Sequence, residues 1–159
     1  MRLTSLAHFS LVIGLTMVVG SFAHADAGHK HGGFAAGEVG TDGSDARVIE
    51  IEIVEANGKM AYSRDRIEIM QNETVRFVLK NAGSLDHEFV LGTAKENRAH
   101  ADMMASMPGM AHADKNMMQV ASGQTSSFVW KFSNKGEFEF ACLIPGHYEA
   151  GMHGIMIVK

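Results

Sequence analysis

Hydrophobic and charged residues alternate along several short segments of this chain. Residues 47–55 read RVIEIEIVE, and this period of two predicts a strand buried on one face. Further strands with β-branched or aromatic residues are predicted at 66–70 (RIEIM), 73–81 (ETVRFVLKN), 86–92 (DHEFVLG), 125–132 (TSSFVWKF), 137–143 (EFEFACL) and 154–159 (GIMIVK). Turn residues such as SNKG at 133–136 separate them, and no helices alternate with them. The pattern predicts an all-β sandwich or barrel.

One segment interrupts this pattern. Residues 93–119 read TAKENRAHADMMASMPGMAHADKNMMQ, with many helix formers and a break at Pro108-Gly109. We expect a helix from Ala94 to about Met107, followed by an irregular loop. Inserted segments of this length are unusual in a small β-sandwich and often have a function.

The N-terminal region has the features of an export signal. Arg2 precedes an apolar run from Leu11 to Val19, and Ala23 and Ala25 form an A-x-A cleavage pattern. We expect cleavage after Ala25, with Ala27 as a second choice. The apolar run is shorter than the roughly 20 residues of a membrane-spanning helix, so we expect no membrane insertion after cleavage.

Three regions follow from these boundaries. Residues 1–25 form the signal peptide, 26–45 a flexible tail rich in Gly and His, and 46–159 one domain with the insertion at about 93–119. The tail contains GHKHGG, in which His29 and His31 are a weak hint of metal binding, although an ordinary solvated linker explains them equally well.

Charge and cysteine content narrow the classes of function. The whole chain has 14 Lys and Arg against 18 Asp and Glu, and removal of residues 1–25 takes away only Arg2, which leaves a net charge of −5. A net negative charge argues against nucleic acid or an anionic membrane as a partner.

The single cysteine, Cys142, cannot form an internal disulfide. It is a buried spectator, an intermolecular link or a metal ligand.

The surroundings of Cys142 favour a metal ligand. The segment ACLIPGHYEAGMHG places Cys142, His147 and Met152 five residues apart. Thiolate, imidazole and thioether together favour copper over zinc, and a cysteine with two histidines and a weak methionine is the blue-copper arrangement. His87, at the start of a predicted strand, is the strongest candidate for the second histidine. His153 should face the opposite side from Met152, since neighbouring strand residues alternate.

These segments resemble the cupredoxins. The resemblance rests on NETVRFVLKNAG, on DHEF and on FACLIPGHYEAGM, and it extends from roughly Arg47 to Lys159. It implies a Greek-key β-sandwich that binds one copper ion through His87, Cys142, His147 and Met152. The Met-rich insertion and the sequence PGHYEAGM look most like the periplasmic copper-tolerance cupredoxins of bacterial copper-resistance systems.

Features that copper enzymes need are absent from the sequence. Ala141 and Leu143 flank Cys142, so the chain lacks the histidine that lies beside the cysteine in multicopper oxidases and copper nitrite reductases and passes electrons to a second copper centre. A binuclear copper site of the oxidase-subunit kind needs two cysteines, and this chain has one. No nucleophile–base motif is evident either. We therefore expect a non-enzymatic, redox-active mononuclear copper protein of the periplasm that acts in copper homeostasis and tolerance. The alternative is a dedicated one-electron carrier; in both cases the redox partner protein is unknown.

The insertion carries a second cluster of soft donors. Six of the twelve methionines lie between residues 103 and 118. Thioethers bind Cu(I) without losing a proton, and packing against the sheet is the competing explanation. The candidate Cu(I) ligands are His100, Met103, Met104, Met107, Met110, His112, Met117 and Met118.

Overall fold

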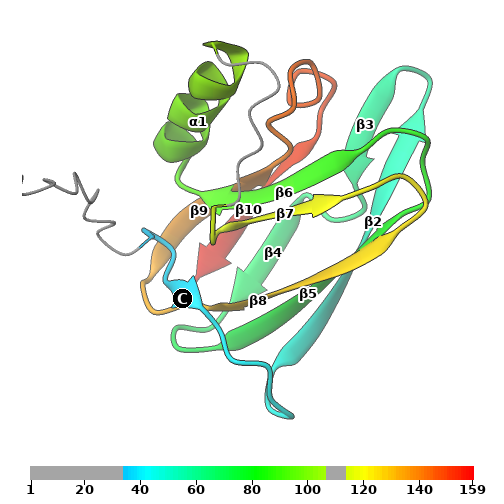
Figure 1. Cartoon of the computed structure of the whole chain (residues 1–159). Helices are drawn as coiled ribbons and strands as arrows, with labels where there is room; N and C mark the ends of the chain where they lie inside the picture. Colours follow the sequence, from blue (N-terminus) through cyan, green and yellow to red (C-terminus); the bar gives the residue numbers. More distant parts are fainter. Residues whose placement is uncertain (1–33, 107–113) are drawn as a thin grey trace, which may run out of the picture. The chain divides into compact units, whose positions relative to one another are not determined.

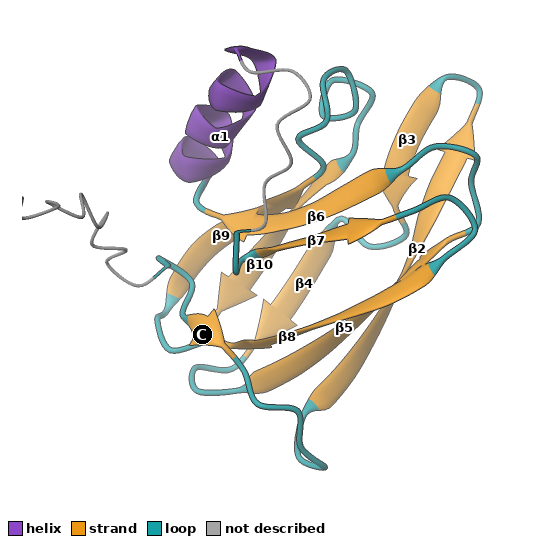
Figure 2. Ribbon diagram, in the orientation of Figure 1, coloured by secondary structure: helices purple, strands orange, loops and turns teal. Residues whose placement is uncertain are grey.

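The computed structural model describes residues 34–106 and 114–159. The predicted signal peptide, His29, His31, Met107, Met110 and His112 lie outside these residues. Within them the chain forms ten strands and one helix, and the strands make two five-stranded sheets (Figures 1 and 2). The predicted all-β class with a helical insertion is confirmed.

The first sheet is organised around a parallel pair of strands. β2 pairs parallel with β5, and the other neighbours in this sheet are antiparallel. The side chains of β2 alternate between exposed and buried, as the sequence predicts. In spatial order the strands are β1 (Glu38–Val39), β8 (Thr125–Lys131), β5 (Thr74–Asn81), β2 (Arg47–Ala56) and β3 (Lys59–Tyr62).

The second sheet also contains one parallel pair, formed by β4 and β10. Consecutive strands of the chain often lie in different sheets, as expected for a Greek-key sandwich. In spatial order the strands are β4 (Arg66–Ile69), β10 (His153–Val158), β9 (Gly136–Ala141), β6 (His87–Gly92) and β7 (Met117–Val120).

Aromatic side chains fill the space between the sheets. Phe89 lies within 5.3 Å of both Phe77 and Phe140, measured between ring centroids, so residues from both sheets interlock. The largest fully buried side chains are Trp130, Phe77, Phe89, Phe132 and Phe140. This core holds the ends of β6 and β9 in place, and the candidate site lies there.

The inserted helix α1 (Ala94–Ser106) packs on the outer side of the second sheet, beside β6 and β9 (Figure 1). It begins with a capping box, in which Glu96 N donates to Thr93 Oγ1 and Thr93 N donates to Glu96 Oε2. Because α1 covers one face and the core the other, every residue of β6 is buried. No helix in 34–106 or 114–159 has the length and apolar character needed to cross a membrane.

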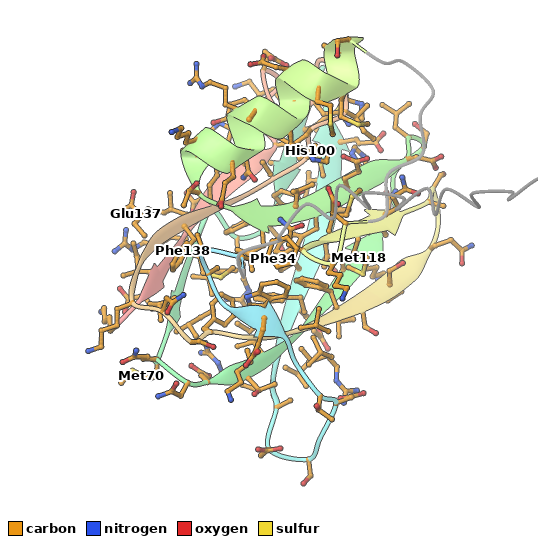
Figure 3. The ribbon with its side chains drawn as sticks, turned by 60° about the vertical axis from the view of Figure 1, so that its left-hand side comes forward. Phe34, Met70, His100, Met118, Glu137 and Phe138 are labelled. Atoms are coloured by element: carbon orange, nitrogen blue, oxygen red, sulfur yellow. The ribbon has the colours of Figure 1, made fainter. Side chains whose placement is uncertain are left out.

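Residues 34–39, which belong to the segment expected to be a flexible tail, pack against the first sheet. Residues 38 and 39 form β1, which pairs with β8, and Ala36 is buried. The ring of Phe34, labelled in Figure 3, packs edge-on against Trp130, with ring centroids 5.4 Å apart. Gly37 permits this approach, because a Cβ there would lie 2.0 Å from the carbonyl oxygen of Lys131. Two paired residues are too short to give a periodic sequence signal.

The insertion also ends earlier than predicted. Met117 and Met118 belong to β7, which pairs with β6, instead of an irregular loop. Met117 is buried with Val90, Ala141 and Leu143 on the outer face of the sheet, and Met118 packs against the main core. Packing therefore accounts for both methionines. Met is not among the residues that are enriched in strands, so it is the pairing with β6 that makes this segment a strand.

Candidate metal centre

The paired strands β6 and β9 bring two of the predicted ligands to one end of the second sheet. His87 is the first residue of β6, and Cys142 directly follows the last residue of β9. The two strands are antiparallel neighbours, with Val90 opposite Ala141. Residues 55 positions apart in the sequence are thus placed together by backbone hydrogen bonds.

The loop between β9 and β10 brings the other two predicted ligands to the same place. Met152 N donates to the carbonyl oxygen of His147 at 3.1 Å, and Cys142 N donates to that of Met152 at 3.0 Å. Backbone hydrogen bonds therefore connect all three residues of the loop. Gly146 and Gly151 have φ angles of 90° and 108°, a conformation that favours glycine, so both tight bends depend on their lack of a side chain.

The donor atoms of three residues converge. His147 Nδ1 lies 3.4 Å from Cys142 Sγ and 3.2 Å from His87 Nδ1. All three atoms lie within 4.8 Å of one another, and they form the metal-binding cluster found among the described His, Cys, Asp and Glu residues. Ligands bound to one ion at about 2.0–2.3 Å would be separated by about 3.3–3.7 Å. The geometry and the mixture of thiol and imidazole donors therefore fit a single small metal ion such as copper.

Burial controls the protonation of the donors. The Cys142 side chain is fully buried, and burial raises the pKa of its thiol to about 11, although Glu88 N donates a hydrogen bond to Sγ at 3.3 Å. Full burial also argues against an intermolecular disulfide. Burial and the neighbouring His87 lower the pKa of His147. A metal ion would thus meet a neutral imidazole at His147 and displace a proton from the thiol.

The neighbouring residues Met152 and His153 differ in burial. Met152 is fully buried in the same core cluster as Cys142, whereas His153 is exposed. The His153 ring stacks on Tyr148, with ring centroids 4.4 Å apart. The backbone hydrogen bond from Cys142 N to the carbonyl oxygen of Met152 places Met152 next to the cluster, and His153 is not part of it.

Glu55, which the sequence analysis did not single out, contacts the cluster. Its Oε1 lies 2.9 Å from His87 Nε2, whereas the other ring nitrogen of His87, Nδ1, is the one beside His147 Nδ1. Hydrogen bonds from His87 and from the backbone at Leu85 and Ser84 lower the pKa of the Glu55 carboxyl to about 2. A sequence signal was available. In β2, Glu55 continues the row of buried residues formed by Ile49, Ile51 and Ile53, where a charged residue is unexpected.

The described candidates for a second site lie in two places. His100, Met103 and Met104 are partly buried on α1, and His100 Nδ1 lies 3.6 Å from Asp114 Oδ2. Met118 lies on β7 (Figure 3). The structure therefore separates the three α1 residues, which remain candidates, from the two β7 methionines, which pack in the sheet.

The fold and the cluster define a copper-binding domain of the cupredoxin class. Residues 49–159 match the family of copper binding proteins described as plastocyanin/azurin, and the chain belongs to this family. Copper is accordingly its cofactor.

The chain is 44% identical over 145 residues to the "Copper-resistant cuproprotein CopI" of Rubrivivax gelatinosus, an alignment that covers 86% of this chain and 88% of that protein. Among solved structures, auracyanin B superposes with a TM-score of 0.63 at 21% identity, covering 78% of this chain and 96% of that chain. A multicopper oxidase variant from Aquifex aeolicus gives a TM-score of 0.57 at 15% identity, covering 77% of this chain and 31% of that enzyme. At these identities both structures show similarity of fold alone.

Proposed function

We propose that the protein is an exported, periplasmic, redox-active type 1 copper protein that acts in copper tolerance. His87, Cys142 and His147 would hold the ion, with Met152 as a weak fourth ligand. The observation that carries the proposal is the convergence of one thiol and two imidazole nitrogens within 4.8 Å. Such a site gives bound copper one-electron Cu(II)/Cu(I) chemistry.

The residues of the site suit electron transfer without large rearrangement. Backbone hydrogen bonds join His147, Met152 and Cys142, so the loop keeps its shape whichever charge the ion carries. Cys142 and His87 are buried, which keeps water from the cluster, whereas His147 is partly exposed beside the exposed Pro145. We therefore place the route for electrons to a partner protein at the His147 ring.

Copper tolerance is favoured over a role as a dedicated electron carrier. The sequence relative is named a copper-resistant cuproprotein, and a simple carrier does not need the Met/His insertion. No second cluster of metal-ligating His, Cys, Asp and Glu occurs within 34–106 and 114–159. The name of the relative and the Met/His insertion support a copper-binding and redox role in tolerance.

A complementation experiment tests this function. A strain lacking the gene should grow poorly at high copper and recover with the wild-type protein, but not with Cys142→Ser. The purified wild-type protein should bind one copper tightly and show a thiolate-to-copper absorption band that Cys142→Ser lacks. Normal copper tolerance of the deletion strain, with a coloured one-copper protein, would favour the electron carrier instead.

We further propose that His100, Met103 and Met104 on α1 bind additional Cu(I), together with the predicted ligands outside the described residues. Their support is the partial exposure of three soft donors on one helix. Met117 and Met118 leave this set, because they pack in β7.

A further inference from the structure

The carboxylate of Glu55 connects the two sheets at the candidate copper centre. Glu55 lies near the end of β2 in the first sheet, and His87 begins β6 in the second. Glu55 Oε1 accepts a hydrogen bond from Leu85 N at 3.1 Å and lies 2.9 Å from His87 Nε2. Oε2 accepts from Ser84 N and Ser84 Oγ, each at 3.1 Å. Both oxygens are therefore used.

The loop before β6 is shaped around this carboxylate. The loop passes close to the carboxylate at Gly83, where a Cβ would lie 1.9 Å from Glu55 Oε1 and would displace it. Asn81 holds the loop from the other side, where its side chain donates to the carbonyl oxygen of Leu85 and accepts from Gly83 N. The position of the carboxylate is thus determined by both the loop and His87.

The hydrogen bond to Glu55 determines which nitrogen of His87 is left with a lone pair that can bind a metal ion. An ionised carboxylate only accepts hydrogen bonds, so His87 Nε2 must carry the hydrogen. A ring that carries only this one hydrogen, as metal binding requires, has its lone pair on Nδ1, the atom that lies 3.2 Å from His147 Nδ1. The His87 side chain is fully buried and that of Glu55 is 19% exposed, so solvent weakens this interaction little.

We propose that Glu55 is a positioning residue of the copper centre that also favours Cu(II) over Cu(I). It holds His87 in the tautomer that presents Nδ1, and it places a negative charge behind a ligand ring. An anion at that position stabilises the more highly charged ion and makes the imidazole a stronger donor. The inference rests on the copper site proposed above, and it predicts a centre that retains oxidised copper.

Two substitutions separate the charge from the hydrogen bond. Glu55→Gln removes the charge but keeps an oxygen that accepts from His87 Nε2, whereas Glu55→Ala removes both. Glu52→Gln is the matched control, because Glu52 lies on the same strand with an exposed side chain. The readouts are the reduction potential, the affinities for Cu(II) and Cu(I), and the His87 tautomer measured by nitrogen-15 NMR in copper-free protein.

We expect the wild-type NMR spectrum to show the hydrogen of His87 on Nε2. Glu55→Gln should raise the reduction potential and weaken Cu(II) binding about 10- to 100-fold, with a smaller loss for Cu(I), while Glu52→Gln matches the wild type. Glu55→Ala should also mix the His87 tautomers. If Glu55→Ala does not fold, the Glu55→Gln protein and the His87 tautomer of the wild type still test the proposed role of Glu55.

Two results would overturn the inference. One is a wild-type His87 with its hydrogen on Nδ1, and the other is a Glu55→Gln protein with the potential and Cu(II) affinity of Glu52→Gln. A wild-type protein that fails to bind copper would instead refute the proposed function, and the tautomer measurement would still test the role of Glu55 in copper-free protein.

Discussion

Binding of Cu(II) should release close to one proton per ion between about pH 7.5 and 9, and Cys142 should be its source. Burial raises the pKa of the Cys142 thiol from 9.0 to about 11, so the sulfur is protonated over this range. Copper binds the thiolate, which requires loss of that proton. The pKa of His147 is lowered by burial and by His87, so its ring is already neutral and releases none.

The size of the effect follows from the pKa of Cys142. The rise from 9.0 to about 11 makes formation of the thiolate about a hundredfold less favourable than for an exposed cysteine. Because one proton is exchanged for each copper, the apparent affinity for Cu(II) should increase about tenfold for each pH unit until the pH approaches the thiol pKa.

Competition with a chelator of known affinity, repeated at several pH values, measures the slope. Calorimetry in buffers with different ionisation enthalpies counts the released protons independently. His147→Ala should bind copper more weakly but keep the proton release, whereas Cys142→Ser should lose it. An affinity that does not change with pH, or equal proton release from Cys142→Ser, would refute the reasoning.

Three further predictions concern the N-terminal segment, the ligand loop and the helix α1. Phe34→Ala should lower the free energy of unfolding by about 1–2 kcal/mol, because it exposes part of the buried Trp130; unchanged thermal or urea unfolding would mean that Phe34 does not pack there in solution. Pro145→Glu should slow electron exchange with a redox partner in stopped-flow experiments while copper stays bound, and an unchanged rate would move the transfer route away from His147. Replacing Met103 and Met104 with Leu should weaken extra Cu(I) binding with less than ~1.5 kcal/mol change in stability; identical Cu(I) competition curves would leave α1 without a metal role.

The main strands could be predicted because hydrophobic and polar residues alternate along them. Segments such as RVIEIEIVE alternate because one face meets the core, and β2 has this pattern of burial. β1 and β7 lack such a signal, because two to four residues with few β-branched side chains become strands only through their partners β8 and β6. The helix was predictable from its composition and its Pro-Gly break, but not its attachment to the sheet.

The attachment of α1 to the second sheet uses polar residues that form no recognisable pattern in the sequence. Asn97 of α1 is buried and donates to Glu139 Oε1 at 2.9 Å, while Tyr148 of the ligand loop donates to Glu139 Oε2 at 3.0 Å. The Cys142, His147 and Met152 segment could be identified by its spacing alone, since those residues share one loop. The contact of Glu55 with His87 joins two sheets, so only the three-dimensional structure reveals it.

X-ray absorption spectroscopy at the copper edge tests the central claim most directly. In protein loaded with one equivalent of Cu(II), we expect one short bond to sulfur and two bonds to imidazole nitrogen, and the short sulfur contribution should disappear in Cys142→Ser. A wild-type spectrum that contains only nitrogen and oxygen ligands, or one that Cys142→Ser leaves unchanged, would contradict a copper centre built on Cys142, His87 and His147.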